Sequence, residues 1–134
     1  MSEMDSIKQS YGRCLLKGDL IGRFYEIFLE SHPDVKPLFA NTDFDIQKQA
    51  LRQGINLMIM FTNESAVGKS GMKRIRDSHS RSGLNIPPNL YQYWKDSLLQ
   101  ALSEFDSKFS DNLRTEWDQN LQIAIDFIIE GYEN

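Results

Sequence analysis

The side chain with the clearest chemical potential in this chain of 134 residues is His79. It closes an amphipathic stretch, residues 71–79, in which Met72, Ile75 and His79 fall on one face of the predicted helix. A neutral imidazole on an apolar face either packs into a core or binds a metal ion. The only other histidine, His32, stands at an expected helix end, a position more typical of the surface. The function of the chain therefore depends on what His79 faces.

Composition and charge exclude several classes of protein. A chain of this length, 40% hydrophobic, suffices for one domain, residues 1–134, with a substantial core. The net charge of −4 gives no reason to expect nucleic acid, and the basic run at residues 69–76 is more typical of a solvated helix face. Cys14 is the only cysteine, which excludes an intrachain disulfide, a thiolate metal cluster and a cofactor attached through paired cysteines.

No segment of the sequence predicts insertion into a membrane. The acidic start, residues 1–5, lacks the apolar core of a signal peptide. The longest apolar window, residues 55–61, is too short to span a bilayer. We therefore expect a cytoplasmic protein that binds neither membrane nor nucleic acid.

Apolar residues recur at helical spacing along nearly the whole chain, which predicts an all-α fold of six or seven helices of unequal length. Asp19 is placed to cap the second helix, and Thr42 with Asp45 forms a potential capping box. Pro87 and Pro88 suit the first turn of a long helix, where their missing N–H groups cost nothing. The expected helices cover residues 4–17, 20–31, 42–63, 71–79, 87–109 and 111–130, with a turn at 34–39 and loops at 63–70 and 80–85.

Other side chains are spaced so that they could face His79 across a pocket. Gln47 and Leu51 share a face of one predicted helix, Tyr25 and Phe28 share a face of another, and Phe39 ends the turn between those helices. Each feature is weak alone, because aromatic and leucine stripes usually form a core. The spacings are more specific: Phe39 lies fourteen residues after Tyr25, Gln47 lies eight after Phe39, and the histidine lies thirty-two after Gln47.

With these residues at these spacings, the chain resembles a globin, in particular the single-domain bacterial haemoglobins and the haem domain of flavohaemoglobins. Residues 24–28 (FYEIF) and 32–39 (HPDVKPLF) are similar to the second helix and following corner of that family. Residues 47–51 (QKQAL) resemble its distal helix, and residues 79–91 (HSRSGLNIPPNLY) resemble its proximal histidine and next helix start. The resemblance covers nearly the whole chain and implies a globin fold, with the helices packed around a haem pocket.

The resemblance implies a b-type haem as cofactor. His79 would be the proximal ligand of the iron, because neutral imidazole is a suitable axial ligand. Phe39 would pack flat against the porphyrin, and Leu51 and Phe28 would form the apolar distal wall. Arg81 could meet a haem propionate, although a solvated loop arginine is the more common arrangement. The further residues expected to contact the cofactor are Ile75, Ile86, Tyr91, Trp94 and Leu98.

The distal side would carry the selectivity for gas ligands. The resemblance places Tyr25 where its phenol O–H donates a hydrogen bond to bound oxygen, and Gln47 would donate a second bond or orient the tyrosine. Carbon monoxide is less polar and gains less from such donors. Two alternatives remain: Tyr25 could be a core tyrosine with its hydroxyl at the surface, and Lys48 could occupy the pocket mouth in place of Gln47.

The sequence departs from the family pattern on the proximal side. The resemblance places Tyr91 near His79, commonly paired with a glutamate from the last helix. The position expected to carry that glutamate is Tyr132, and Glu130 lies two residues earlier. A shift of two residues turns a side chain by about 200° around a helix, so Glu130 is not expected to reach the histidine. A ligand without that carboxylate would be less basic and would favour peroxide chemistry less.

Three functions are compatible with these residues. The first is reversible binding of oxygen, nitric oxide or carbon monoxide. The second is nitric oxide dioxygenation, which would require a separate reductase as partner, because the sequence ends at Asn134, just after the haem domain. The third is a haem-free globin-like domain for interaction or sensing, which typically lacks the proximal histidine. The sequence favours gas binding.

Overall fold

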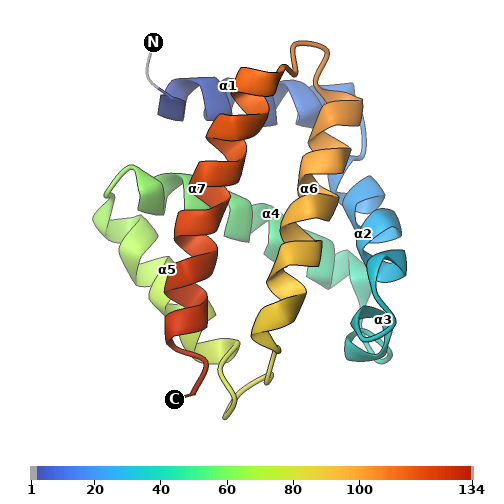
Figure 1. Cartoon of the computed structure of the whole chain (residues 1–134), viewed down its shortest axis with the longest axis vertical. Coiled ribbons are helices and arrows are strands. Elements are labelled where there is room, and N and C mark those ends of the chain that lie inside the picture. Colours follow the sequence, from blue (N-terminus) through green and yellow to red (C-terminus); the bar gives the residue numbers. More distant parts are fainter. Residues whose placement is uncertain (1–2, 134) are drawn as a thin grey trace.

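The computed structural model describes residues 3–133, with side chains from Asp5 onward, and this part of the chain is all-α, as predicted. Seven α-helices and one 3₁₀ turn follow one another through short loops (Figure 1). Their bounds are α1 Glu3–Lys17, α2 Leu20–Ser31, α3 Val35–Leu38, α4 Phe44–Thr62, α5 Ala66–Ser78, η1 Pro88–Leu90, α6 Tyr91–Phe105 and α7 Asp111–Glu130.

The caps of α2 and α4 are both aspartates. Asp19 accepts a hydrogen bond of 2.9 Å from the backbone N–H of Gly22, so its predicted role as a cap is confirmed. The predicted capping box of Thr42 with Asp45 is wrong. Asp43 is the cap of α4, because its carboxylate accepts from the N–H groups of Asp45 and Ile46. The helix therefore begins at Phe44 and not at Thr42.

The predicted loop at residues 63–70 is partly helical, because α5 begins at Ala66 behind a Ser65 cap. Gly68, the glycine of the predicted loop, and Gly71, at the start of the predicted helix, both serve close packing. A side chain at Gly68 would collide with the backbone of α4 at Met60 and Phe61. Gly71 lies against the side chain of Leu57 in the same way. These glycines let α5 approach α4 closely.

The predicted helix over residues 87–109 is shorter at both ends. Residues 88–90 form a 3₁₀ turn before α6, in which the N–H of Leu90 donates to the carbonyl of Pro87. At the other end α6 stops at Phe105, because Asp106 has an extended backbone conformation and its side chain accepts from the N–H of Lys108 at 2.9 Å.

The helices enclose one hydrophobic core. Figure 1 shows α6 and α7 side by side, with α4 crossing behind them and α1 lying across one end of the pair. On the two flanks, α5 packs against α4 and α7, and α2 packs against α6. Large apolar side chains from these helices are almost fully buried between them, among them Phe24, Ile55, Met72, Leu98 and Trp117. In the part of the chain that the structure describes, no helix is both long and apolar enough to cross a membrane.

One buried carboxylate ties α1 to the end of α6. Asp106 is 3% exposed and accepts hydrogen bonds from Ser10 at 2.6 Å and from the Nε and Nη2 atoms of Arg13 at 2.6 and 2.9 Å. Trp117 of α7 donates to Ser10 at 3.0 Å and extends this network to a third helix. Burial opposes ionisation of Asp106, but these hydrogen bonds outweigh burial and lower its pKa.

We expect Asp106→Asn to lower the free energy of unfolding by about 2–3 kcal/mol at neutral pH, because hydrogen bonds to charged groups contribute about 1.5–3 kcal/mol. Since folding lowers the pKa of Asp106, its stabilisation is complete above the ordinary value of 3.8 and is lost on further acidification. Urea denaturation at several pH values measures both effects. Arg23→Gln is the control, because it breaks the exposed Arg23–Glu104 pair and should have a much smaller effect. Equal effects of the two substitutions would contradict this role of Asp106.

Candidate functional site

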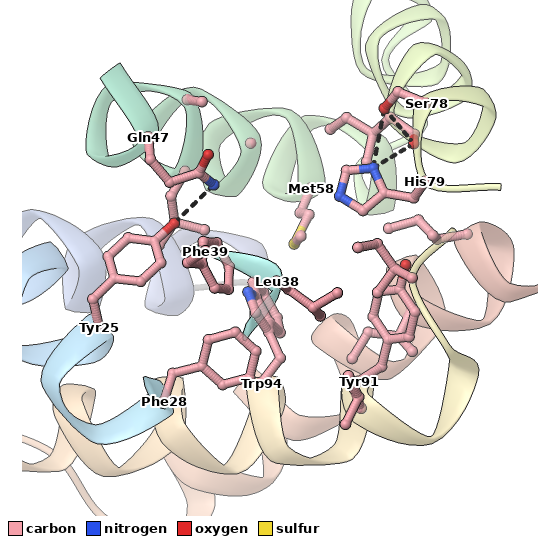
Figure 2. Close-up of a pocket in the computed structure, with 18 residues that line it drawn as sticks. Tyr25, Phe28, Leu38, Phe39, Gln47, Met58, Ser78, His79, Tyr91 and Trp94 are labelled. Atoms are coloured by element: carbon pink, nitrogen blue, oxygen red, sulfur yellow. Dashed lines mark hydrogen bonds between the residues drawn. The ribbon is translucent and has the colours of Figure 1, made fainter. Parts of the chain in front are cut away.

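A cavity of about 320 Å³ is lined by side chains from α2 to α7 and from the loop after α5, and Figure 2 shows these side chains. Its wall is mostly aromatic and aliphatic, and the residues that line it include no lysine, arginine, aspartate or glutamate. The volume is in the usual range for a small-molecule site. The residues around it are Tyr25, Phe28, Leu38, Phe39, Gln47, Ala50, Leu51, Gly54, Met58, Ile75, Ser78, His79, Ile86, Leu90, Tyr91, Trp94, Ile125 and Ile128.

His79 stands at one end of this cavity, directly after the last turn of α5. Its Nδ1 atom lies 2.8 Å from the carbonyl oxygen of Ile75 and 3.0 Å from the hydroxyl of Ser78. The Ser78 hydroxyl itself donates to the same carbonyl at 2.9 Å. Because a carbonyl only accepts, Nδ1 carries the proton and Nε2 keeps its lone pair. Figure 2 shows Nε2 on the cavity side of the ring.

Burial keeps the imidazole of His79 neutral. It lowers the pKa of this half-buried side chain, and the hydrogen bond to the backbone at Ile75 opposes the shift only in part. A neutral ring with its Nδ1–H engaged by the backbone presents Nε2 as a free electron-pair donor. Within residues 3–133, the hydrogen-bond partners of Nδ1 are both uncharged groups.

Tyr25 and Gln47 form a polar pair at the other end of the cavity. The side-chain amide of Gln47, in α4, donates to the hydroxyl oxygen of Tyr25, in α2, at 3.0 Å (Figure 2). Because this oxygen accepts from Gln47, its own proton is available to a group in the cavity. Burial raises the pKa of Tyr25 above its ordinary value, while the bond from Gln47 lowers it. The phenol is therefore a neutral hydrogen-bond donor over the physiological pH range.

Aromatic rings hold Tyr25 in place and line the cavity beside it. The Tyr25 ring meets Phe24, Phe39 and Phe44 edge to face, with centroids 5.0, 5.8 and 5.5 Å apart. Phe39 also meets Phe28 at 6.1 Å. Such edge-to-face pairs fix ring orientation as well as burying apolar area. The polar pair is thus rigidly framed, with apolar surface between it and His79.

All the residues that the sequence predicted for the site line this cavity except Arg81 and Leu98. Leu98 is fully buried in the core. Arg81 forms an ion pair of 3.1 Å with Glu133, and its guanidinium lies 5.3 Å from the centre of the Tyr132 ring. Lys48, the alternative to Gln47, lies outside the cavity wall, 4.0 Å from Asp19. A contact of Arg81 with a propionate stays a prediction.

The sequence interpretation missed eight residues of the wall. Ala50, Gly54 and Met58 continue the face of α4 that carries Gln47 and Leu51, so helical spacing was sufficient to find them. Ser78 and Leu90 adjoin predicted residues, and Leu38 adjoins Phe39. Nothing in the local pattern distinguishes Ile125 and Ile128 from the other buried residues of α7. Their part in the wall follows from how α7 packs, which the sequence does not encode locally.

The proximal tyrosine and glutamate expected from the family pattern are arranged differently here. Tyr91 lines the cavity, and burial, with a smaller contribution from Tyr132, raises the pKa of its phenol. The Tyr132 hydroxyl donates to the side-chain oxygen of Asn85 at 2.7 Å. Glu130 is exposed and does not line the cavity, which agrees with the expectation that it does not reach His79. The immediate surroundings of His79 therefore contain a carbonyl and a hydroxyl where the pattern has a carboxylate.

Comparison with known proteins identifies this arrangement of helices as the globin fold. A crystal structure from Pseudomonas aeruginosa, described as structurally highly homologous to a human haemoglobin, superposes with a TM-score of 0.95 and 34% sequence identity. The match covers 99% of this chain and 100% of the other. No protein-family model and no curated protein sequence matches the chain. At this identity and coverage the chain belongs to the globin family.

The bond between Gln47 and Tyr25 generates a prediction that requires no cofactor. Because this bond lowers the pKa of Tyr25, Gln47→Leu should raise that pKa further above 10. Carbon-13 NMR of labelled tyrosine rings, titrated with pH and assigned with Tyr25→Phe, measures it. Gln92→Leu is the control, since Gln92 is exposed and bonds to the exposed Asp96 one turn along α6. An unchanged Tyr25 titration would contradict the bond.

Proposed function

We propose that this protein binds a b-type haem in the cavity through His79 and reversibly holds a diatomic gas, oxygen above all, next to Tyr25 and Gln47. One observation carries the proposal. A neutral imidazole with a free nitrogen and a neutral phenol donor stand at opposite ends of the same apolar cavity.

The residues present fit a haem. A flat apolar macrocycle suits a wall built from Phe28, Phe39, Leu51 and Trp94. Among the described residues, no group of three or more histidine, cysteine, aspartate or glutamate side chains could hold a metal ion without such a cofactor. His79 would therefore be the single protein ligand, as in proteins that hold haem iron through a proximal histidine. With no cation among the residues that line the cavity, the macrocycle itself would be held by apolar contact and by His79.

The bound haem iron would supply a coordination position for a small gas molecule. Tyr25 would direct its O–H toward a polar gas such as oxygen, because its bond with Gln47 uses the hydroxyl oxygen as acceptor and not the phenol proton. A hydrogen bond of this kind contributes about 1.5–3 kcal/mol, or about ten- to a hundredfold in affinity. Leu51 and Phe28 would exclude water from the same region. Carbon monoxide, which is less polar, would gain less.

The proximal side favours reversible binding over oxidative chemistry. A carboxylate next to a ligating histidine would increase its basicity, but the groups bonded to His79 are the Ile75 carbonyl and the Ser78 hydroxyl. Nitric oxide dioxygenation would use the same Tyr25–Gln47 pair, and it would also need a reductase as partner. We therefore place gas binding first and regard dioxygenation as the alternative that turnover measurements would reveal.

The first test is whether His79 retains haem. Wild-type apoprotein titrated with haemin should develop a Soret band that shifts on reduction and again with carbon monoxide. His79→Ala should lose stable retention, because the one axial donor is removed. His32→Ala is the control, since this histidine lies outside the cavity and contacts Tyr93. Wild-type retention by His79→Ala, with helical content unchanged in circular dichroism, would refute the assignment of the ligand.

The second test concerns the phenol. Tyr25→Phe should speed oxygen release about ten- to a hundredfold, because one charge-assisted hydrogen bond is lost. Gln47→Leu should have a smaller effect, since the phenol would remain. Stopped-flow replacement of oxygen by carbon monoxide measures both rates. Tyr93→Phe makes the same chemical change outside the cavity and should leave the rate unchanged. An unchanged rate in Tyr25→Phe would show that the phenol does not contact the gas.

A further inference from the structure

Three aromatic rings from different segments meet in pairs at the end of the cavity that holds Tyr25. Measured between ring centroids, Phe44 lies 5.5 Å from Tyr25 and 6.0 Å from Phe39, and Phe39 lies 5.8 Å from Tyr25. The rings come from α2, from the corner after α3 and from the first position of α4. Tyr25 and Phe39 line the cavity, whereas Phe44 does not. Phe44 therefore contacts the phenol ring and not the cavity itself.

The direction of the Tyr25 O–H depends on the plane of its ring. A phenol O–H prefers to lie in the ring plane, because the oxygen is conjugated with the ring. The bond from Gln47 holds the hydroxyl oxygen 3.0 Å from the amide nitrogen, but one bond to an oxygen atom leaves the ring plane free to turn. The plane must therefore be set by the groups that pack against the ring.

Three rings stand nearly perpendicular to that of Tyr25, but their surroundings differ. Phe24, at an interplanar angle of 74°, adjoins Tyr25 on α2 and is completely buried in the core. Phe39, at 71°, belongs to the cavity wall. Phe44, at 75°, is half-buried and comes from α4, the helix that also supplies Gln47. The contact of Phe44 is thus the one that can be removed without opening the core or the cavity wall.

The first turn of α4 holds Phe44 in this place. The carboxylate of Asp43 caps the turn by accepting from two of its backbone N–H groups, at 3.0 and 3.4 Å. Phe44 and Gln47 are three residues apart, so their side chains are neighbours on one face of the helix. One capped turn therefore supplies both the ring contact and the hydrogen bond to Tyr25.

We propose that Phe44 is a positioning residue for Tyr25, which keeps the plane of the phenol ring in the orientation that directs its O–H into the cavity. Loss of the Phe44 ring would let the phenol turn while the bond from Gln47 persists. The effect on bound oxygen rests on the proposed function, whereas the effect on the Tyr25 ring belongs to the protein without any ligand. Selectivity between oxygen and carbon monoxide would then depend in part on a residue outside the cavity wall.

The first experiment measures the rotation of the Tyr25 ring in the apoprotein. In Phe44→Leu, which keeps an apolar side chain but removes the ring, flips of the Tyr25 ring should accelerate about twofold to tenfold, the equivalent of one aromatic pair. NMR of labelled tyrosine rings, assigned with Tyr25→Phe, measures the flip rate. Phe61→Leu is the matched control, because it removes the ring pair with Phe127 at the other end of α4. Phe44→Tyr retains the ring and should keep the wild-type rate.

The second experiment uses the haem-loaded protein and stopped-flow ligand replacement. Phe44→Leu should speed oxygen release about twofold to tenfold, the equivalent of the same aromatic pair. It should leave carbon monoxide release nearly unchanged, because the less polar gas gains little from the phenol. In the Tyr25→Phe background the substitution should have no further effect on oxygen release, since the O–H on which Phe44 acts is absent. Phe61→Leu should change neither rate.

Several outcomes would overturn the role of Phe44. They are a wild-type flip rate of the Tyr25 ring in Phe44→Leu, an equal change in the release of both gases, and an undiminished effect of Phe44→Leu in the Tyr25→Phe protein. A wild-type protein that forms no Soret band would refute haem binding, and the apoprotein experiment then decides the positioning role by itself. If circular dichroism shows that Phe44→Leu does not fold, Phe44→Met takes its place, because methionine fills irregular apolar gaps without a ring.

Discussion

The hydrogen bond between His79 Nδ1 and the carbonyl of Ile75 is the constraint on which the site depends. It fixes the tautomer of the ring and aims Nε2 at the cavity. The bond joins two residues four apart at the end of α5, so it forms because the helix continues to this point. The place of this helix end in the fold depends on the packing of α5 against α4. Gly68 and Gly71 permit that approach, since any side chain at either position would collide with α4. Two glycines without chemical function thus let the helix that carries His79 at its end pack closely against α4.

Burial has opposite effects on the pKa values of the groups at the two ends of the cavity, but it leaves both groups uncharged. Burial lowers the pKa of His79 and raises the pKa of Tyr25, so both groups are uncharged near neutral pH. One end then offers a lone pair and the other a proton donor, with apolar surface between them. An uncharged pair in an apolar cavity suits a small neutral ligand better than an ion. The absence of charged side chains from the described cavity wall agrees with this preference.

The sequence predicted ten of the eighteen residues that line the cavity, through shared helical faces and through the resemblance to globins. Gln47 and Leu51 share a helical face whatever the tertiary fold, and the same face continues to Met58. The start of α5 was predicted wrongly because glycine favours loops in isolation, whereas Gly68 is needed for packing against a helix several residues earlier. The contributions of Ile125 and Ile128 depend on long-range packing. The Arg81–Glu133 pair also joins distant segments, and no local pattern indicates it.

The departure at position 132 changes how the proximal side can control its ligand. A glutamate bonded to His79 would act electronically, by drawing on the Nδ1 proton and raising the basicity of the ring. Tyr132 instead directs its hydroxyl to Asn85, and the carbonyl and hydroxyl that remain next to Nδ1 carry no charge. Without a carboxylate bonded to Nδ1, His79 would be a less basic ligand. This arrangement agrees better with the reversible binding that we propose than with the activation of oxygen.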